Sequence, residues 1–341
     1  MKKRIQWIDN LRGLAMILVV IGHMPINNTL KIYLYSFHLP LFFMISGIAY
    51  GLSSNKESLG EYVKKMFKRL IIPYFLLNLL FAPLWYINSV VLAKQDITIL
   101  DPILGTLFSN QLWKGLFSNV TWFLPALFII SITFKAIDTS VSSYRSKSFL
   151  VVLIASIGVI LSIFDIRLIL PWHFQTCFIA LSFYYLGYLY IINKEHIDKF
   201  INEKVNSNIV QSLFLIGLLI IGYLLGIYNN KISMHANNYQ NILIFYVSAL
   251  ITCFSVINLI KKTKESPLLK FIGINTLVYM TAHCPIMRFF RYLSSYSNTF
   301  LNNYPIASGI IIMVLIIPLV FFINRFLPFI VGKKRHNYKK S

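Results

Sequence analysis

An arginine and a histidine near the start of the chain have the spacing of a ligand-binding group and a reactive group. Arg12 lies in the run 9–15, DNLRGLA, and His23 follows it after ten mostly apolar residues. On an α-helix these side chains share nearly one face and lie roughly 16 Å apart along the axis. That spacing suits a long ligand with an anionic end. The alternative is a histidine that only makes a hydrogen bond between helices.

The composition indicates a membrane environment around this pair. Hydrophobic residues make up 57% of the 341, with 28 Phe and 20 Tyr, and 13% are charged, against roughly a quarter in soluble chains. The sequence therefore predicts an all-α polytopic membrane protein. Ten apolar stretches have about the length that spans a bilayer: 11–27, 32–52, 71–93, 118–137, 149–165, 171–192, 209–228, 240–260, 271–293 and 304–328.

The lysines and arginines predict the orientation. With the N-terminus inside, 22 of them fall in inner segments and five in outer ones, namely Lys31, Lys94, Lys114, Arg167 and Lys231. The positive-inside rule then places both termini in the cytoplasm. The net charge of +21 is explained by this topology and by anionic lipid, and we expect no nucleic-acid partner. We expect one membrane domain over 1–341, with a basic cytoplasmic tail at about 333–341 and no extramembrane domain.

Four side chains that could do chemistry fall at a similar predicted depth, slightly outside the middle of the bilayer: His23, His38, His283 and Trp122. Ionisable residues inside a span mark a functional site by default. The alternative for His38 and His283 is that each only bonds backbone groups freed by the proline two residues later. The alternative for Trp122 is an anchor at the membrane interface.

Three arginines and another histidine lie near predicted span ends. Arg69, at the cytoplasmic mouth of the third span, is either a positive-inside residue or a phosphate ligand facing Arg12. Arg288 and Arg291, near the outer end of the ninth span, either reach lipid headgroups or meet an anionic glycan. His173, at an outer boundary, is expected at the surface.

The sequence favours chemistry without a metal. No carboxylate and no matched ligand spacing accompanies His23, His38 and His283, so we expect no metal site there. The three cysteines, Cys177, Cys253 and Cys284, all lie in predicted spans. We expect them to be small buried apolar residues.

Taken in order, these motifs resemble those of the acyltransferase-3 family of integral membrane acyltransferases. The resemblance covers essentially the whole chain. It rests on residues 9–15 with the Arg12-x10-His23 spacing, HLPLFFMISG at 38–47, RLIIPY at 69–74, WFL at 122–124 and GINTL at 273–277 leading to His283. Family members often carry a tyrosine three residues before the late histidine, where this chain has Met280.

The resemblance implies transfer of an acetyl or other short acyl group from cytoplasmic acyl-CoA to a hydroxyl. The acceptor would be a cell-envelope or exported polysaccharide or a glycolipid, reached from the bacterial cytoplasmic membrane. Glycan-assembly proteins or a second copy of the chain are further expected partners. The alternative is a transporter or polymerase of glycans or lipid-linked oligosaccharides without acyl chemistry, which would not need the track from Arg12 to His23.

The resemblance also implies roles for the candidate residues. Arg12, with Arg69, would bind CoA phosphates, and Asp9 would hold the Arg12 guanidinium in position. His23 would be the general base. The remaining candidates would orient the acceptor, stabilise the oxyanion or bind the glycan: His38, His283, Trp122, Arg288 and Arg291.

Overall fold

The computed structural model describes residues 5–53, 56–109, 120–166, 170–204 and 207–333. Within these ranges the chain forms fifteen α-helices, and its only extended pairing is one isolated bridge between Ser233 and Asn238. The all-α prediction is confirmed. Apart from Lys333, the expected basic tail lies outside the described residues.

Eight helical stretches among the described residues are long and apolar enough to cross a membrane: Asn28–Gly51 (α2), Leu59–Leu92 (α3 to η2), Phe123–Ser140 (α6), Tyr144–Ile163 (α7), Pro171–Ile192 (η3 and α8), Asn208–Tyr228 (α10), Ile242–Lys262 (α11) and Pro305–Phe326 (α15). The multi-span prediction is confirmed by these eight stretches. The cytoplasmic placement of both termini stays a prediction.

The two other expected spans form the helices that carry most of the candidate chemistry. They are α1 (Gln6–His23) and α13 (Thr276–Leu293), and neither is among the eight apolar stretches. Each contains two charged residues and a histidine within 18 residues, which lowers its mean hydropathy. Most of the candidate residues therefore lie on the least apolar long helices of the bundle.

The ninth expected span is not one helix. Residues 271–293 were expected to be continuous, but α12 (Pro267–Ile274) ends at Asn275 and α13 begins after it. The Asn275 side chain donates to the Phe271 carbonyl at 2.8 Å and accepts from Lys333 Nζ at 2.9 Å. An asparagine that bonds neighbouring backbone competes with helix continuation. The break opens the end of α12 toward the candidate site.

The third expected span is interrupted as well. The expected residues 71–93 belong to a longer helical stretch, which is built from α3 (Leu59–Met66), the π-helical segment η1 (Phe67–Ile71), α4 (Ile72–Tyr86) and a second π-helical segment η2 (Ile87–Leu92). The remaining short elements lie between the long helices or after the last one. Those between helices are α5 (Leu100–Phe108), α9 (Lys194–Lys204), α14 (Ser295–Asn303) and the 3₁₀ turns η3 (Pro171–His173) and η4 (Met234–Ala236), and the turn η5 (Pro328–Val331) follows α15.

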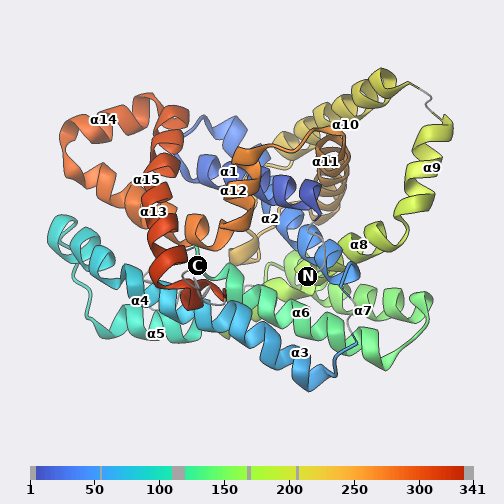
Figure 1. Ribbon diagram of the computed structural model, residues 1–341, viewed down its shortest axis with the longest axis horizontal. Coiled ribbons are helices and arrows are strands. Elements are labelled where there is room, and N and C mark those ends of the chain that lie inside the picture. The colour runs from blue at the N-terminus through green and yellow to red at the C-terminus, as the bar shows by residue number, and fades with distance from the viewer. Residues whose placement is uncertain (1–4, 54–55, 110–119, 167–169, 205–206, 334–341) are drawn as a thin grey trace, which may run out of the picture.

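The helices surround a centre made by α1, α2 and α12 (Figure 1). In that view α13, α14 and α15 gather on the left, α3, α4, α6 and α7 run along the lower side, and α8 to α11 lie on the right. Helix α2 packs most extensively on α8 (Phe174–Ile192). A Cβ at Gly47 would lie 1.8 Å from the Tyr184 carbonyl oxygen, so glycine permits this close crossing.

Candidate active site

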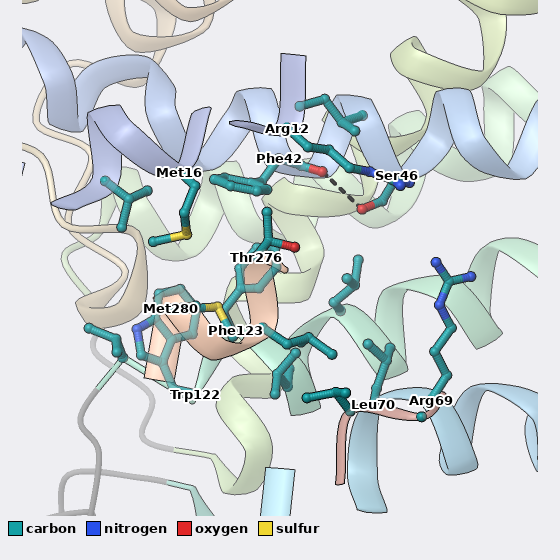
Figure 2. A pocket seen from close by; sticks show the side chains of 18 of the residues that line it. Arg12, Met16, Phe42, Ser46, Arg69, Leu70, Trp122, Phe123, Thr276 and Met280 are labelled. Carbon is teal, nitrogen blue, oxygen red and sulfur yellow. Dashed lines mark hydrogen bonds between the residues drawn. The ribbon is translucent and has the colours of Figure 1, made fainter. Parts of the chain in front are cut away.

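A cavity of about 1240 Å³ lies inside this helix arrangement. Its walls come from α1, α2, α3 with η1, the start of α4, α6, the turn η4, the break between α12 and α13, and the turn η5. Figure 2 shows Arg12 and Arg69 at one end and Trp122 and Met280 at the other. We call these the cationic end and the aromatic end. The cavity holds the expected anion-binding residues and several expected reactive residues together.

The cationic end is strongly basic. Its charged side chains are Arg12, Glu61, Lys64, Lys65, Lys68, Arg69 and Lys333. Glu61 is occupied in the capping box of α3, where it accepts the backbone N–H of Ser58 at 2.9 Å. A concave surface lined by cations attracts polyanions such as phosphate esters.

Arg12 is positioned by a close crossing of α1 and α12. A Cβ at Gly13 would lie 2.0 Å from the Leu269 carbonyl oxygen, and one at Gly273 would lie 1.9 Å from the Asp9 carbonyl oxygen. Only glycine allows the two backbones to approach in this way. The predicted pair forms, with Asp9 Oδ1 3.7 Å from Arg12 Nη1.

Arg69 lies in η1, opposite Arg12 (Figure 2). Pro73 has no N–H, so it cannot give the Arg69 carbonyl the usual i→i−4 helix bond. The chain widens here, and the Ile72 N–H bonds the Phe67 carbonyl five residues back. Single π-helical turns of this kind are frequent at functional sites. Arg69 therefore faces Arg12 at the cationic end, and its role as a phosphate ligand stays a prediction.

The candidate histidines form a chain of ring contacts. The rings of His23 and His283 have centroids 5.0 Å apart at 66°. Tyr35 lies between His23 and His38, and its ring centroid is 6.2 Å from that of His23 and 5.0 Å from that of His38. His23, Tyr35 and His38 border the cavity, and His283 lies behind His23 with no exposed surface. The predicted common depth of the three histidines therefore corresponds to one cluster.

Each of these histidines bonds its own helix in the same way. Nδ1 lies 2.8 Å from the Val19 carbonyl oxygen in His23, 2.5 Å from the Leu34 carbonyl oxygen in His38 and 2.8 Å from the Tyr279 carbonyl oxygen in His283. Because a carbonyl only accepts, Nδ1 carries the proton and Nε2 of the neutral ring carries a lone pair. The cluster therefore presents basic Nε2 atoms, as a general base requires.

These bonds differ from the alternative in which His38 and His283 only bond the backbone groups freed by Pro40 and Pro285. Pro40 and Pro285 would leave the carbonyls of Ser36 and Thr281 without their i→i−4 donors. The histidine side chains instead bond the carbonyls of Leu34 and Tyr279, each two residues earlier in the chain. Their hydrogen bonds fix the rings and do not replace the bonds that proline removes.

At the aromatic end, Trp122 contacts two histidines that the sequence did not place there, of which His235 lines the cavity. The Trp122 ring lies 4.9 Å from the ring of His173 and 6.0 Å from that of His235. His173 is 2% exposed, so its expected surface position is wrong. The sequence suggests a surface site because Pro171 marks an element boundary, but the turn η3 folds inward, with Trp172 and His173 in the left-handed region at φ 57° and 52°.

His235 lies in a loop that is joined to α8, where the Thr176 hydroxyl donates to the Met234 carbonyl at 3.0 Å. Asn229 donates to the Tyr239 carbonyl at 3.1 Å and accepts from the Asn241 N–H at 2.9 Å, which closes the loop between α10 and α11. Burial lowers the pKa of His235, and the Lys231 ammonium lowers it further. His235 is therefore a neutral imidazole near pH 7. No periodic signal in the sequence marks it.

Two expected site residues lie elsewhere. Arg288 and Arg291 are described residues on α13 but do not line the cavity. Lys333 lines it and was not expected to, since it follows the last helix. Tyr35 was also missed, although its position three residues before His38 places both on one helix face.

The chain was compared with protein families, curated proteins and solved structures. It matches the acyltransferase-3 family, described as an acyltransferase domain, over residues 5–325. No curated protein and no solved structure matches it. The match spans nearly the whole chain and includes every cavity residue up to Met280. The chain therefore belongs to the acyltransferase-3 family and is a multi-pass membrane acyltransferase.

Proposed function

We propose that this protein transfers an acetyl or other short acyl group from cytoplasmic acyl-CoA to a hydroxyl of a cell-envelope or exported glycan or glycolipid. The observation that carries the proposal is the polarity of one cavity, with guanidinium groups at one end and His23 farther along the helix of Arg12. Family membership favours acyl transfer over glycan transport or polymerisation without acyl chemistry.

The donor half of the proposal assigns the CoA phosphates to the cationic end. Arginine binds phosphate through two parallel N–H bonds, and Arg12 and Arg69 supply that geometry from opposite walls. The helical rise puts His23 roughly 16 Å from Arg12. An extended pantetheine arm covers this distance, so the thioester lies near His23 when the phosphates lie at the cationic end.

The chemical step uses the lone pair of His23 Nε2. The imidazole accepts the proton of the acceptor hydroxyl while the hydroxyl oxygen attacks the thioester carbonyl carbon. The carbon–sulfur bond then breaks, and the imidazolium returns the proton to the leaving CoA thiolate. The bond from Nδ1 to the Val19 carbonyl supports this role because it fixes the tautomer. His38 and His283 act as orienting groups on either side.

The acceptor is assigned to the aromatic end. A sugar ring packs well on the face of an indole, and Trp122 is flanked there by the imidazoles of His173 and His235. Arg288 and Arg291 would meet an anionic part of the glycan outside the cavity. Localisation in the bacterial cytoplasmic membrane, with the cationic end inside, is part of the proposal.

Analysis of envelope glycans by mass spectrometry tests the proposal. A strain lacking the protein should lose an acyl substituent from one glycan, and the wild-type chain should restore it. The His23→Ala variant should be present in the membrane at the same level and should not restore it. Identical glycan acylation with and without the protein would contradict the proposed acceptor class.

Membrane sidedness has its own test. The three native cysteines are all buried, so cysteines introduced into the wild-type chain can be labelled against a quiet background. A membrane-impermeant maleimide added to intact cells should label Asn302→Cys and should leave Lys264→Cys unlabelled. The reverse pattern would place the cationic end on the side without CoA.

A further inference from the structure

His23 has two neighbours with metal-binding chemistry on α13. Nε2 of His283 is buried and has no hydrogen-bond partner, and Cys284 is a buried free thiol. One ligand atom from each of His23, His283 and Cys284 lies within 4.8 Å of the others. Two imidazoles and one thiolate are ligands that Zn²⁺ commonly takes.

The bonds of the two histidines are those of metal ligands. A histidine that binds a metal through one nitrogen nearly always donates its other N–H to a carbonyl or carboxylate. Nδ1 of His23 and of His283 each lies 2.8 Å from a backbone carbonyl oxygen, Val19 in one case and Tyr279 in the other. Both Nε2 atoms are thereby left for a ligand.

The geometry allows three protein ligands and one open position. Bond lengths of 2.0–2.3 Å in a tetrahedral site separate ligand atoms by about 3.3–3.6 Å. The three side chains would close by roughly 1 Å on binding, which small rotations about their χ angles provide. His23 borders the cavity, so an ion has a path to the cluster and a water molecule can take the fourth position.

We propose that His23, His283 and Cys284 form a binding site for Zn²⁺, and that the bound ion inhibits acyl transfer. On binding, the Cys284 thiol releases its proton to solvent and its sulfur bonds the metal, while each imidazole contributes its Nε2 lone pair. The inhibition rests on the function proposed above, because a metal on His23 Nε2 occupies the lone pair that accepts the acceptor's proton. The sequence predicts no metal site at His23, His38 and His283, and the site proposed here has Cys284 in place of His38.

Cobalt provides a direct probe of the site. Titration of Co²⁺ into the purified full chain in detergent should produce the thiolate-to-cobalt charge-transfer absorption, and Zn²⁺ should displace it. The Cys284→Ser and Cys284→Ala variants should lose this absorption, and their Zn²⁺ affinity should fall at least about 100-fold, more than loss of an outer-shell group causes. Cys253→Ser removes another buried free thiol and should bind Co²⁺ as wild type does.

The proposed inhibition of acyl transfer by Zn²⁺ is measured in a separate experiment. Transfer of labelled acetyl from acetyl-CoA to membrane glycans should fall as free Zn²⁺ rises in wild type and in Cys253→Ser, and should resist Zn²⁺ in Cys284→Ser. Absence of the charge-transfer absorption in wild type, or its retention in both Cys284 variants, overturns the site. A cobalt signal in a chain that transfers no acyl group supports the site while contradicting the proposed function. Zn²⁺-insensitive transfer in wild type overturns the inhibition.

Discussion

The imidazole rings of His23 and His283 contact each other edge to face, with centroids 5.0 Å apart, although one ends α1 and the other lies in the middle of α13. Residues in contact give mutational effects that do not add, so the pair can be tested as a pair.

Replacing both histidines with glutamine measures this coupling. His23→Gln should lower acyl transfer about 10²- to 10⁴-fold, since glutamine bonds but does not shuttle a proton. His283→Gln should lower it less, and the double variant should be no slower than His23→Gln. Rates with labelled acetyl-CoA, together with thermal stability, check this. The exposed His196→Gln is the matched control, and additive losses would contradict a shared role.

Substitution of Arg12 tests the donor end. Arg12→Ala should weaken acyl-CoA binding about 10- to 100-fold, as expected when a charge-assisted bond of roughly 1.5–3 kcal/mol is lost. Arg12→Lys should recover only part, because lysine cannot make the bidentate contact. Calorimetry with a non-hydrolysable acyl-CoA analogue measures both. Arg145→Ala, at an exposed site on α7, should bind normally; an unaffected Arg12→Ala protein would reject the assignment.

The crossing of α1 and α12 predicts an unequal response to added methyl groups. Gly13→Ala and Gly273→Ala place a Cβ about 2 Å from a backbone oxygen, so overpacking should destabilise each variant by about 1–3 kcal/mol. Gly217→Ala is the matched control, since a Cβ there meets nothing within 4 Å. Thermal unfolding of the three purified proteins makes the comparison. Equal melting temperatures would mean that the helices do not cross this closely.

His235 predicts a pH dependence of stability. Its folded-state pKa is lowered by burial and by Lys231 below the ordinary value of 6.5. Below pH 6.5 the unfolded chain therefore binds a proton that the folded chain does not, and the folded state loses stability as the pH falls. His235→Gln should flatten this loss between pH 6.5 and 5 in thermal unfolding. His196→Gln should keep the wild-type slope, and an unchanged slope in His235→Gln would contradict a buried neutral ring.

The sequence predicted the part of the site that depends on helical spacing. Arg12 and His23 line one cavity, and His38 and Trp122 line it with them, because regular helices in a bilayer convert sequence distance into depth. Gly13 belongs to the motif at residues 9–15, and the structure explains why a glycine is needed there, because the α12 backbone lies directly against it.

The rest depends on contacts that have no period. The break at Asn275 is fixed by side-chain bonds to Lys333 and Asn324, which follow it by many residues. His235 enters the cavity through a loop closed by the Asn229 side chain. His173 turns inward because Trp172 and His173 have left-handed backbone conformations, which these residue types do not predict. The spacing of residues in the sequence predicts how deep each one lies in the membrane, but it does not predict such long-range contacts.

The cavity's two unlike ends have a kinetic consequence. A single space bounded by Arg12 and Arg69 at one end and by Trp122 at the other has room for a donor and an acceptor at the same time. Under the proposed function, the acyl group then passes directly from one to the other within a ternary complex, and no acylated protein accumulates. Initial rates measured at several fixed acceptor concentrations should give intersecting double-reciprocal lines, whereas an acyl-enzyme route would give parallel ones.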